Sequence, residues 1–145
     1  MTDYILDTCV DIDPKHVNYP DYFFRDLWKN TKVRLVIGGT KANREINRKT
    51  KLRELLNNLK DRNQVVQVCG EKVDTSEEAL SARISEIIGD APQECDDLHV
   101  FALAKVSDCL FVISRDNRMA VCRGKIRNTV GHDHCPNIKV IQNEA

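Results

Sequence analysis

Four carboxylates in the sequence have the chemical type and the spacing to bind metal ions. Asp7, Glu45, Asp97 and Asp116 each lie beside the end of a predicted strand or in the first turns of a predicted helix. Carboxylates gathered in one pocket repel one another, and hard divalent cations such as Mg²⁺ or Mn²⁺ relieve that repulsion through oxygen ligands. The chemistry to expect is hydrolysis of a phosphodiester by bound cations, without a protein nucleophile.

Short apolar segments predict the strands that must position these acids. Such runs, rich in β-branched residues, are typical of buried parallel strands. The predicted strands are the clear segments 4–6, 33–37 and 109–113 and the weaker segments 65–68 and 138–141.

Helical patterns lie between these strands. Thr75 and Glu78 have the spacing of a capping box, which predicts a helix start there. The predicted helices cover residues 19–29, 41–60, 76–89 and 97–106, the last apolar almost all round. Alternating strands and helices predict one α/β domain over residues 1–145, with a parallel sheet flanked by helices on both faces.

The predicted elements place the acids at one edge of the sheet. Ligands of open α/β sheets bind beyond the carboxyl ends of the strands. Asp7 directly follows the first strand and Asp116 follows strand 109–113, while Glu45 lies in the helix entered from strand 33–37. Asp97 opens helix 97–106, with Asp96 as its N-cap; the reverse assignment is the alternative. A single acid after a strand is usually a polar turn residue, but four such acids favour a metal site.

Four pieces of the chain together resemble the PIN-domain nucleases, which include VapC-like toxin endoribonucleases. The pieces are YILDTCV (4–10), ANREI (42–46), DLHVFALA (97–104) and FVISRD (111–116). The resemblance implies a five-stranded parallel sheet and an endoribonuclease dependent on Mg²⁺ or Mn²⁺. It makes Asp7, Glu45, Asp97 and Asp116 the catalytic and metal-binding quartet. It also makes Thr8 and Ser114 hydroxyl residues that support the site, and it implies an RNA substrate, an antitoxin partner and a homodimer.

The sequence departs from the family pattern at a few places. Cys9 stands where the family often has Asn or another small residue. His132, His134 and Cys135, with Cys122, have the ligand types of a zinc site, but their spacing is too tight and irregular for a structural zinc motif. We therefore expect a polar loop there. His99 lies in the apolar helix and is predicted to be a core or rim histidine.

The charge is distributed unevenly, although the net charge is zero. Residues 29–62 and 115–127 are mainly basic, whereas residues 71–97 are mainly acidic. Bases beside a metal site can hold the phosphates of a substrate, and most other charge runs are solvated surface. The candidates for substrate binding are Arg44, Arg48, Arg115 and Arg118. No aromatic residues alternate with these bases, so base-specific recognition is not indicated.

Composition bounds the location and the alternatives. No apolar run approaches the ~20 residues that span a bilayer, and the first residues lack the pattern of a secretory signal, so we expect a cytoplasmic protein. Its six cysteines form no C-x-x-C motif and are expected to remain free thiols. The alternative function is a catalytically silent PIN-like module that binds RNA or a protein partner. The complete set of acids counts against it.

Overall fold

Five parallel strands form one sheet in the computed structural model, which describes residues 2–7, 30–90, 95–114, 117–131 and 136–141. The strands are β1 (Thr2–Leu6), β2 (Val33–Ile37), β3 (Val65–Gln67), β4 (Phe111–Ile113) and β5 (Lys139–Ile141). Their order in the sheet is β3-β2-β1-β4-β5, and every neighbouring pair is parallel. This confirms the predicted α/β class and all five predicted strands, although β1 begins two residues earlier than predicted and the last three strands are shorter.

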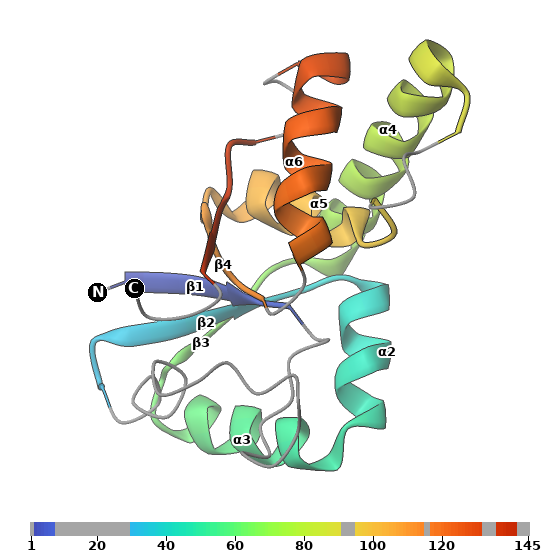
Figure 1. The fold of residues 1–145 in the computed structure, drawn as a ribbon. Coiled ribbons are helices and arrows are strands. Elements are labelled where there is room, and N and C mark those ends of the chain that lie inside the picture. Colours follow the sequence, from blue (N-terminus) through green and yellow to red (C-terminus); the bar gives the residue numbers. More distant parts are fainter. Residues whose placement is uncertain (1, 8–29, 91–94, 115–116, 132–135, 142–145) are drawn as a thin grey trace.

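Helices cover both faces of this sheet, as predicted (Figure 1). On one face lie α2 (Thr40–Arg48) and α3 (Thr50–Asp61). The other face carries α4 (Gly70–Ile88), α5 (Leu98–Ser107) and α6 (Asn117–Val130). None of these helices is both long and apolar enough to cross a membrane in the part of the chain that the structure describes.

Three helix predictions need correction. The single helix predicted over 41–60 is two helices, because Lys49 between them has an extended backbone (φ −110°, ψ 96°). The helix start predicted from the capping box at Thr75 is wrong, because α4 begins at Gly70 and Thr75 lies inside that helix. Helix α6 was not predicted at all. The helix predicted over 19–29 lies outside the described residues.

Side chains of adjacent strand residues enter opposite cores, as the twofold repeat of a strand requires. On β1, Ile5 packs against the α4–α6 side and Leu6 against the α2–α3 side. On β4, Val112 and Ile113 divide in the same way. Residues 98–104 of α5 are all buried, which confirms the prediction of an apolar helix surrounded by protein.

The turn from β2 into α2 holds that helix against the start of α4. Gly39 has φ +100°, and a Cβ there would lie 2.9 Å from Val73 Cγ1, so only glycine fits without strain. The carboxylate of Asp74, on α4, accepts hydrogen bonds from Thr40 N (2.9 Å) and Thr40 Oγ1 (2.5 Å) at the first residue of α2. Gly39 is the N-cap residue of α2 but has no side chain to accept a hydrogen bond, so Asp74 of α4 supplies this cap instead.

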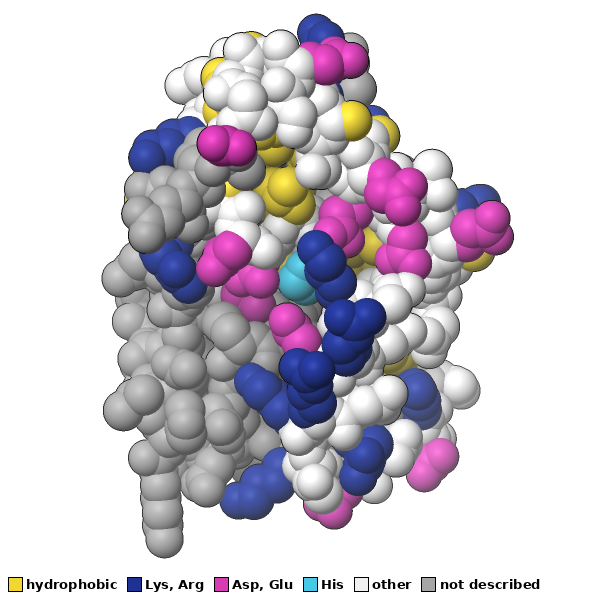
Figure 2. All heavy atoms as spheres, turned by 90° about the vertical axis from the view of Figure 1, so that its right-hand side faces the viewer, with side chains coloured by type: hydrophobic (Ala, Val, Ile, Leu, Met, Phe, Trp, Pro, Cys, Tyr) yellow, Lys and Arg dark blue, Asp and Glu magenta, His cyan; other side chains and the backbone are white. Residues whose placement is uncertain are grey.

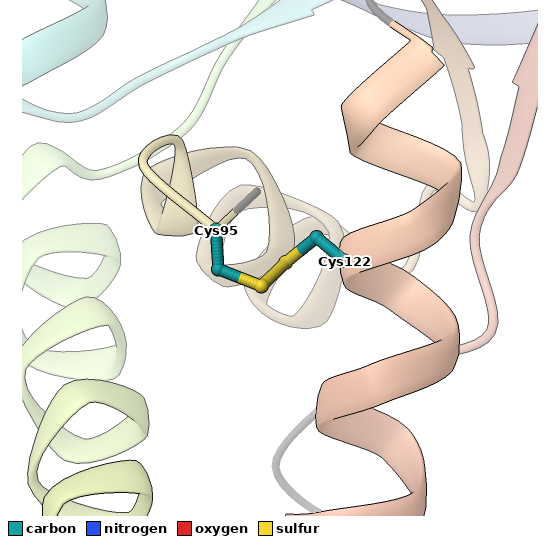
Figure 3. Close-up of a disulfide and its surroundings, with 2 residues drawn as sticks. All are labelled: Cys95 and Cys122. Atoms are coloured by element: carbon teal, nitrogen blue, oxygen red, sulfur yellow. A yellow bond between two sulfur atoms is a disulfide. The ribbon is translucent and has the colours of Figure 1, made fainter. Parts of the chain in front are cut away.

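A disulfide joins the segment before α5 to α6, contrary to the expectation that the cysteines stay free. Cys95 and Cys122 are bonded, with their Cα atoms 5.1 Å apart (Figure 3). Cys69 and Cys109 are free thiols. The two cysteines are 27 positions apart in the sequence, and nothing in the sequence indicated their proximity, which depends on how α5 and α6 pack. Cys95, one of the two bonded residues, lies two positions before Asp97 in the sequence.

Candidate metal centre

The candidate metal centre lies beside β1, at the point where the strand order of the sheet reverses. From β1 the sheet continues through β2 to β3 on one side and through β4 to β5 on the other. Crevices at such switch points, beyond the carboxyl ends of the strands, are the usual ligand sites of open α/β sheets. Asp7 follows β1 and Ser114 follows β4, so both residues stand at this point.

Asp7 and Ser114 are joined to each other in the interior. The Ser114 hydroxyl donates a hydrogen bond of 2.7 Å to Asp7 Oδ2, and the backbone N–H of Asp7 donates to the carbonyl oxygen of Ile113. Asp7 is 1% exposed and Ser114 is fully buried. The serine that was expected to support the site therefore contacts the Asp7 carboxylate directly.

Glu45, Asp97 and His99 form a group that could hold a metal ion. One ligand atom from each residue lies within 4.8 Å of the others. Glu45 is in the second turn of α2, on one face of the sheet, and His99 is in the first turn of α5, on the other. Asp97 is the N-cap residue of α5. The carboxyl edge of the sheet is the place where these helices meet, so the group needs both layers.

The electrostatics of Glu45 tie Asp7 to the same group. Burial is the largest cause that raises the pKa of Glu45, and the negative charges of Asp97 and Asp7 raise it further. His99 and, more weakly, Lys49 act in the opposite direction. The charges of Asp97 and Asp7 thus disfavour the ionised form of Glu45. A divalent cation would remove that conflict.

The assignments of Asp96 and Asp97 need one correction. Asp96 was predicted to be the N-cap of α5, but Asp97 occupies that position, and its side chain makes no capping hydrogen bond. Asp96 is instead exposed and pairs with Arg118, at 3.6 Å. Arg118 had been expected to hold substrate phosphates, and half of its side chain remains exposed beside this partner.

Several predicted site residues lie outside the part of the chain that the structure describes. They are Thr8, Arg115, Asp116, His132, His134 and Cys135. Cys122 was weighed as a zinc ligand, but its sulfur is bonded to Cys95, so it cannot ligate zinc in this state.

Basic side chains border the acidic group. Arg44 and Arg48, on α2 next to Glu45, are both exposed. Figure 2 shows a run of Lys and Arg side chains passing close beside a histidine and acidic side chains on one face of the molecule. Anionic groups approaching the carboxylates would therefore meet positive charge at their border.

His99 is the residue that sequence reasoning undervalued. It is a buried histidine, as expected, but it also belongs to the carboxylate group. Its Nδ1 is buried and has no hydrogen-bond partner among the described residues. The D-x-H spacing of Asp97 and His99 at a helix start was the available signal. Two carboxylates and one imidazole are a chemically reasonable donor set for a divalent metal ion.

Comparisons with known proteins leave the family open. No family model, no curated protein and no solved structure matches this chain. The function must therefore be argued from the residues and their geometry.

Proposed function

We propose that this protein is a divalent-metal-dependent endoribonuclease that hydrolyses RNA phosphodiester bonds at the centre formed by Asp7, Glu45 and Asp97. The observation that carries the proposal is that ligand atoms of Glu45, Asp97 and His99 lie within 4.8 Å of one another at the carboxyl edge of the sheet. Asp7 acts electrostatically on Glu45 in the same place. Asp116 lies outside the described residues and completes the proposed quartet from the sequence alone, through its position after strand 109–113 and the resemblance.

The roles of the residues follow from their contacts. When bound, a divalent ion such as Mg²⁺ or Mn²⁺ would polarise the phosphoryl group and activate a water molecule. Asp97 and Glu45 would hold the ion with carboxylate oxygens. The Ser114 hydroxyl orients Asp7 through one of its oxygens. Arg44 and Arg48, exposed beside Glu45, would bind the flanking phosphates of the substrate.

RNA is proposed as the substrate because of the sequence resemblance and the basic border. Phosphate contacts from Arg and Lys give affinity without sequence preference, so cleavage should weaken as salt rises. An antitoxin partner and a homodimer are further proposals from the same resemblance. The rival function is a module that binds RNA or a protein at this surface without turnover.

The test is cleavage of end-labelled single-stranded RNA by the metal-free full chain, titrated with Mg²⁺ or Mn²⁺. We expect internal cleavage that chelation stops. Asp97→Asn should reduce the rate at least about 100-fold, because even changes to outer contacts of metal centres cost about 10- to 100-fold. Asp108→Asn is the matched control, since Asp108 caps the other end of the same helix in a left-handed conformation that Asn tolerates.

The outcomes separate the two functions. A rate near the wild type in folded Asp97→Asn would overturn the proposed centre. RNA binding by the wild type without cleavage, at any concentration of either ion, would favour the binding module instead. Equal losses in Asp97→Asn and Asp108→Asn would indicate damage to α5 rather than to a metal centre.

A further inference from the structure

The imidazole of His99 is enclosed by protein and has an unusual combination of neighbours. His99 is 4% exposed, and it lies in a helix whose residues 98–104 are all buried. One of its ring nitrogens lies within 4.8 Å of a carboxylate oxygen of Glu45 and of Asp97. A buried histidine with only apolar neighbours would be an ordinary core residue. The two carboxylates beside His99 make it a candidate metal ligand.

The Nδ1 atom of His99 supplies a second, independent observation. It is buried and has no hydrogen-bond partner among the described residues. A buried polar atom without a partner costs about 1–3 kcal/mol, so native proteins seldom keep one without a reason. Metal-ligating histidines usually have one nitrogen on the ion and the other in a defined contact. An ion held with Glu45 and Asp97 would give the imidazole a partner that the described part of the chain does not supply at Nδ1.

We propose that His99 is a metal ligand and that its nitrogen makes the centre select a first-row transition-metal ion, with Mn²⁺ as the test case, over Mg²⁺. The inference rests on the metal centre of the proposed function, but not on RNA being the substrate. His99 thereby determines the metal specificity of the site. Asp7, Glu45 and Asp97 supply the charge that any divalent ion needs.

The selectivity follows from the chemistry of the donors. Mg²⁺ is small and hard, prefers oxygen in near-octahedral geometry and gives up its waters reluctantly. Imidazole nitrogen is a softer donor that suits transition metals, whereas Mn²⁺ also accepts carboxylate oxygen. A set of two carboxylates and one imidazole therefore gains more with Mn²⁺ than with Mg²⁺. A site of carboxylates alone would have no such bias.

A charged imidazole would act differently, and the difference is measurable. A protonated His99 would pair with Glu45, consistent with its lowering effect on the pKa of that carboxyl. In that role it would repel every cation, and its removal would change the affinities for Mn²⁺ and Mg²⁺ by the same factor. A neutral His99 that ligates the ion would instead contribute mainly to the affinity for Mn²⁺. The ratio of the two affinities therefore distinguishes a ligand from a counter-charge.

The experiment is calorimetric titration of the metal-free full chain with MnCl₂ and with MgCl₂. The wild type should bind Mn²⁺ at least about tenfold more tightly than Mg²⁺. His99→Leu should lower Mn²⁺ affinity at least about tenfold and leave Mg²⁺ affinity within about threefold. His134→Leu is the matched control, because it removes a histidine of the tail that was weighed as a zinc site and should change neither affinity.

A spectroscopic readout covers the case in which His99→Leu does not fold. Pulsed electron paramagnetic resonance of the Mn²⁺-loaded wild type should show coupling to a directly bound imidazole ¹⁴N, and His134→Leu should retain it. The inference is overturned if that coupling is missing, if neither ion binds, or if folded His99→Leu keeps the wild-type ratio of affinities. Selective Mn²⁺ binding without RNA cleavage would overturn the nuclease proposal alone. Cleavage with equal affinities would overturn this inference alone.

Discussion

The two ends of strand β1 carry carboxylates in opposite situations. Asp3, near the amino end, receives two hydrogen bonds from the Arg34 guanidinium, at 2.8 and 3.0 Å, and this contact raises the pKa of Arg34. Asp7, just past the carboxyl end, accepts a hydrogen bond from the neutral hydroxyl of Ser114. Its charge adds to burial and to the charge of Asp97 in raising the pKa of Glu45. At the amino end, Arg34 on the neighbouring strand balances the charge of Asp3. At the carboxyl end, Asp7 lies among other carboxylates.

This contrast separates a carboxylate that is paired with a cation on the neighbouring strand from one that lies among other carboxylates. The Asp3–Arg34 pair joins neighbouring strands and needs nothing further. Burial, and then the charges of Asp97 and Asp7, disfavour the ionised form of Glu45 and raise its pKa. Groups with a perturbed pKa are common at functional sites. Changes at the two ends of the sheet should therefore have opposite consequences.

The largest difference is expected in RNA cleavage. Asp7→Asn keeps the shape of the side chain and an oxygen for the Ser114 hydroxyl, but removes the charge. It should lower the initial rate with saturating metal at least about 100-fold, and Asp116→Asn should do the same. Asp3→Asn, on the same strand, should stay within about twofold. Comparable rates for Asp7→Asn and Asp3→Asn would remove the functional distinction between the two ends.

The disulfide should have the largest effect on stability. Cross-links that close loops of this length contribute about 3 kcal/mol. Cys122→Ala should therefore lower the free energy of unfolding by about that amount in urea without reductant. Cys69→Ala, which removes an exposed free thiol, should change it by less than about 0.5 kcal/mol. If both variants unfold like the wild type, Cys95 and Cys122 are not bonded in solution.

In the absence of metal, substitutions at the two ends of β1 should have opposite effects on the melting temperature. In metal-free buffer, Asp7→Asn should melt at the wild-type temperature or above it, because repulsion is relieved, whereas Asp3→Asn should melt lower. Mn²⁺ at about 100 times its Kd should stabilise the wild type by about 2.7 kcal/mol and Asp7→Asn by clearly less. Thermal melts with and without the ion measure this. A destabilised, metal-free Asp7→Asn would make Asp7 a structural residue.

The smallest effect concerns pH, where Glu45 and Asp74 should act with opposite signs. The pKa of Glu45 is raised, so in metal-free buffer its contribution to stability falls as pH rises from its ordinary value of 4.5 through the raised folded value. Hydrogen bonds from Thr40 lower the pKa of Asp74 below its ordinary 3.8. Its stabilising contribution is present above that value and is lost as pH falls through the lowered one.

Paired variants would isolate these contributions in urea unfolding between about pH 3 and pH 7. Glu45→Gln should remove the loss of stability on the rising side, and Asp74→Asn should remove the loss on the falling side. Unfolding curves of Glu45→Gln that keep the wild-type dependence on pH would show that the pKa of Glu45 is not raised in the folded protein.

Local patterns predicted most of the secondary structure, and the errors have identifiable causes. The VRLVI segment at 33–37 became β2 with unchanged bounds, because a run of apolar β-branched residues has few other solutions. The break at Lys49 was missed because no Gly or Pro marks it. Helix α6 was missed although its buried residues Met119, Cys122, Ile126 and Val130 recur at helical spacing, so this signal was available.

The sequence by itself determined the strands, most helices and the acids beside them, because periodicity and residue type act over a few neighbouring residues. That was enough to point to Asp7, Glu45 and Asp97. Only the tertiary structure decided that β1 lies between β2 and β4, that Cys95 meets Cys122, and that His99 joins the carboxylates. These contacts depend on how distant segments cross over and pack, and short-range patterns do not encode that geometry.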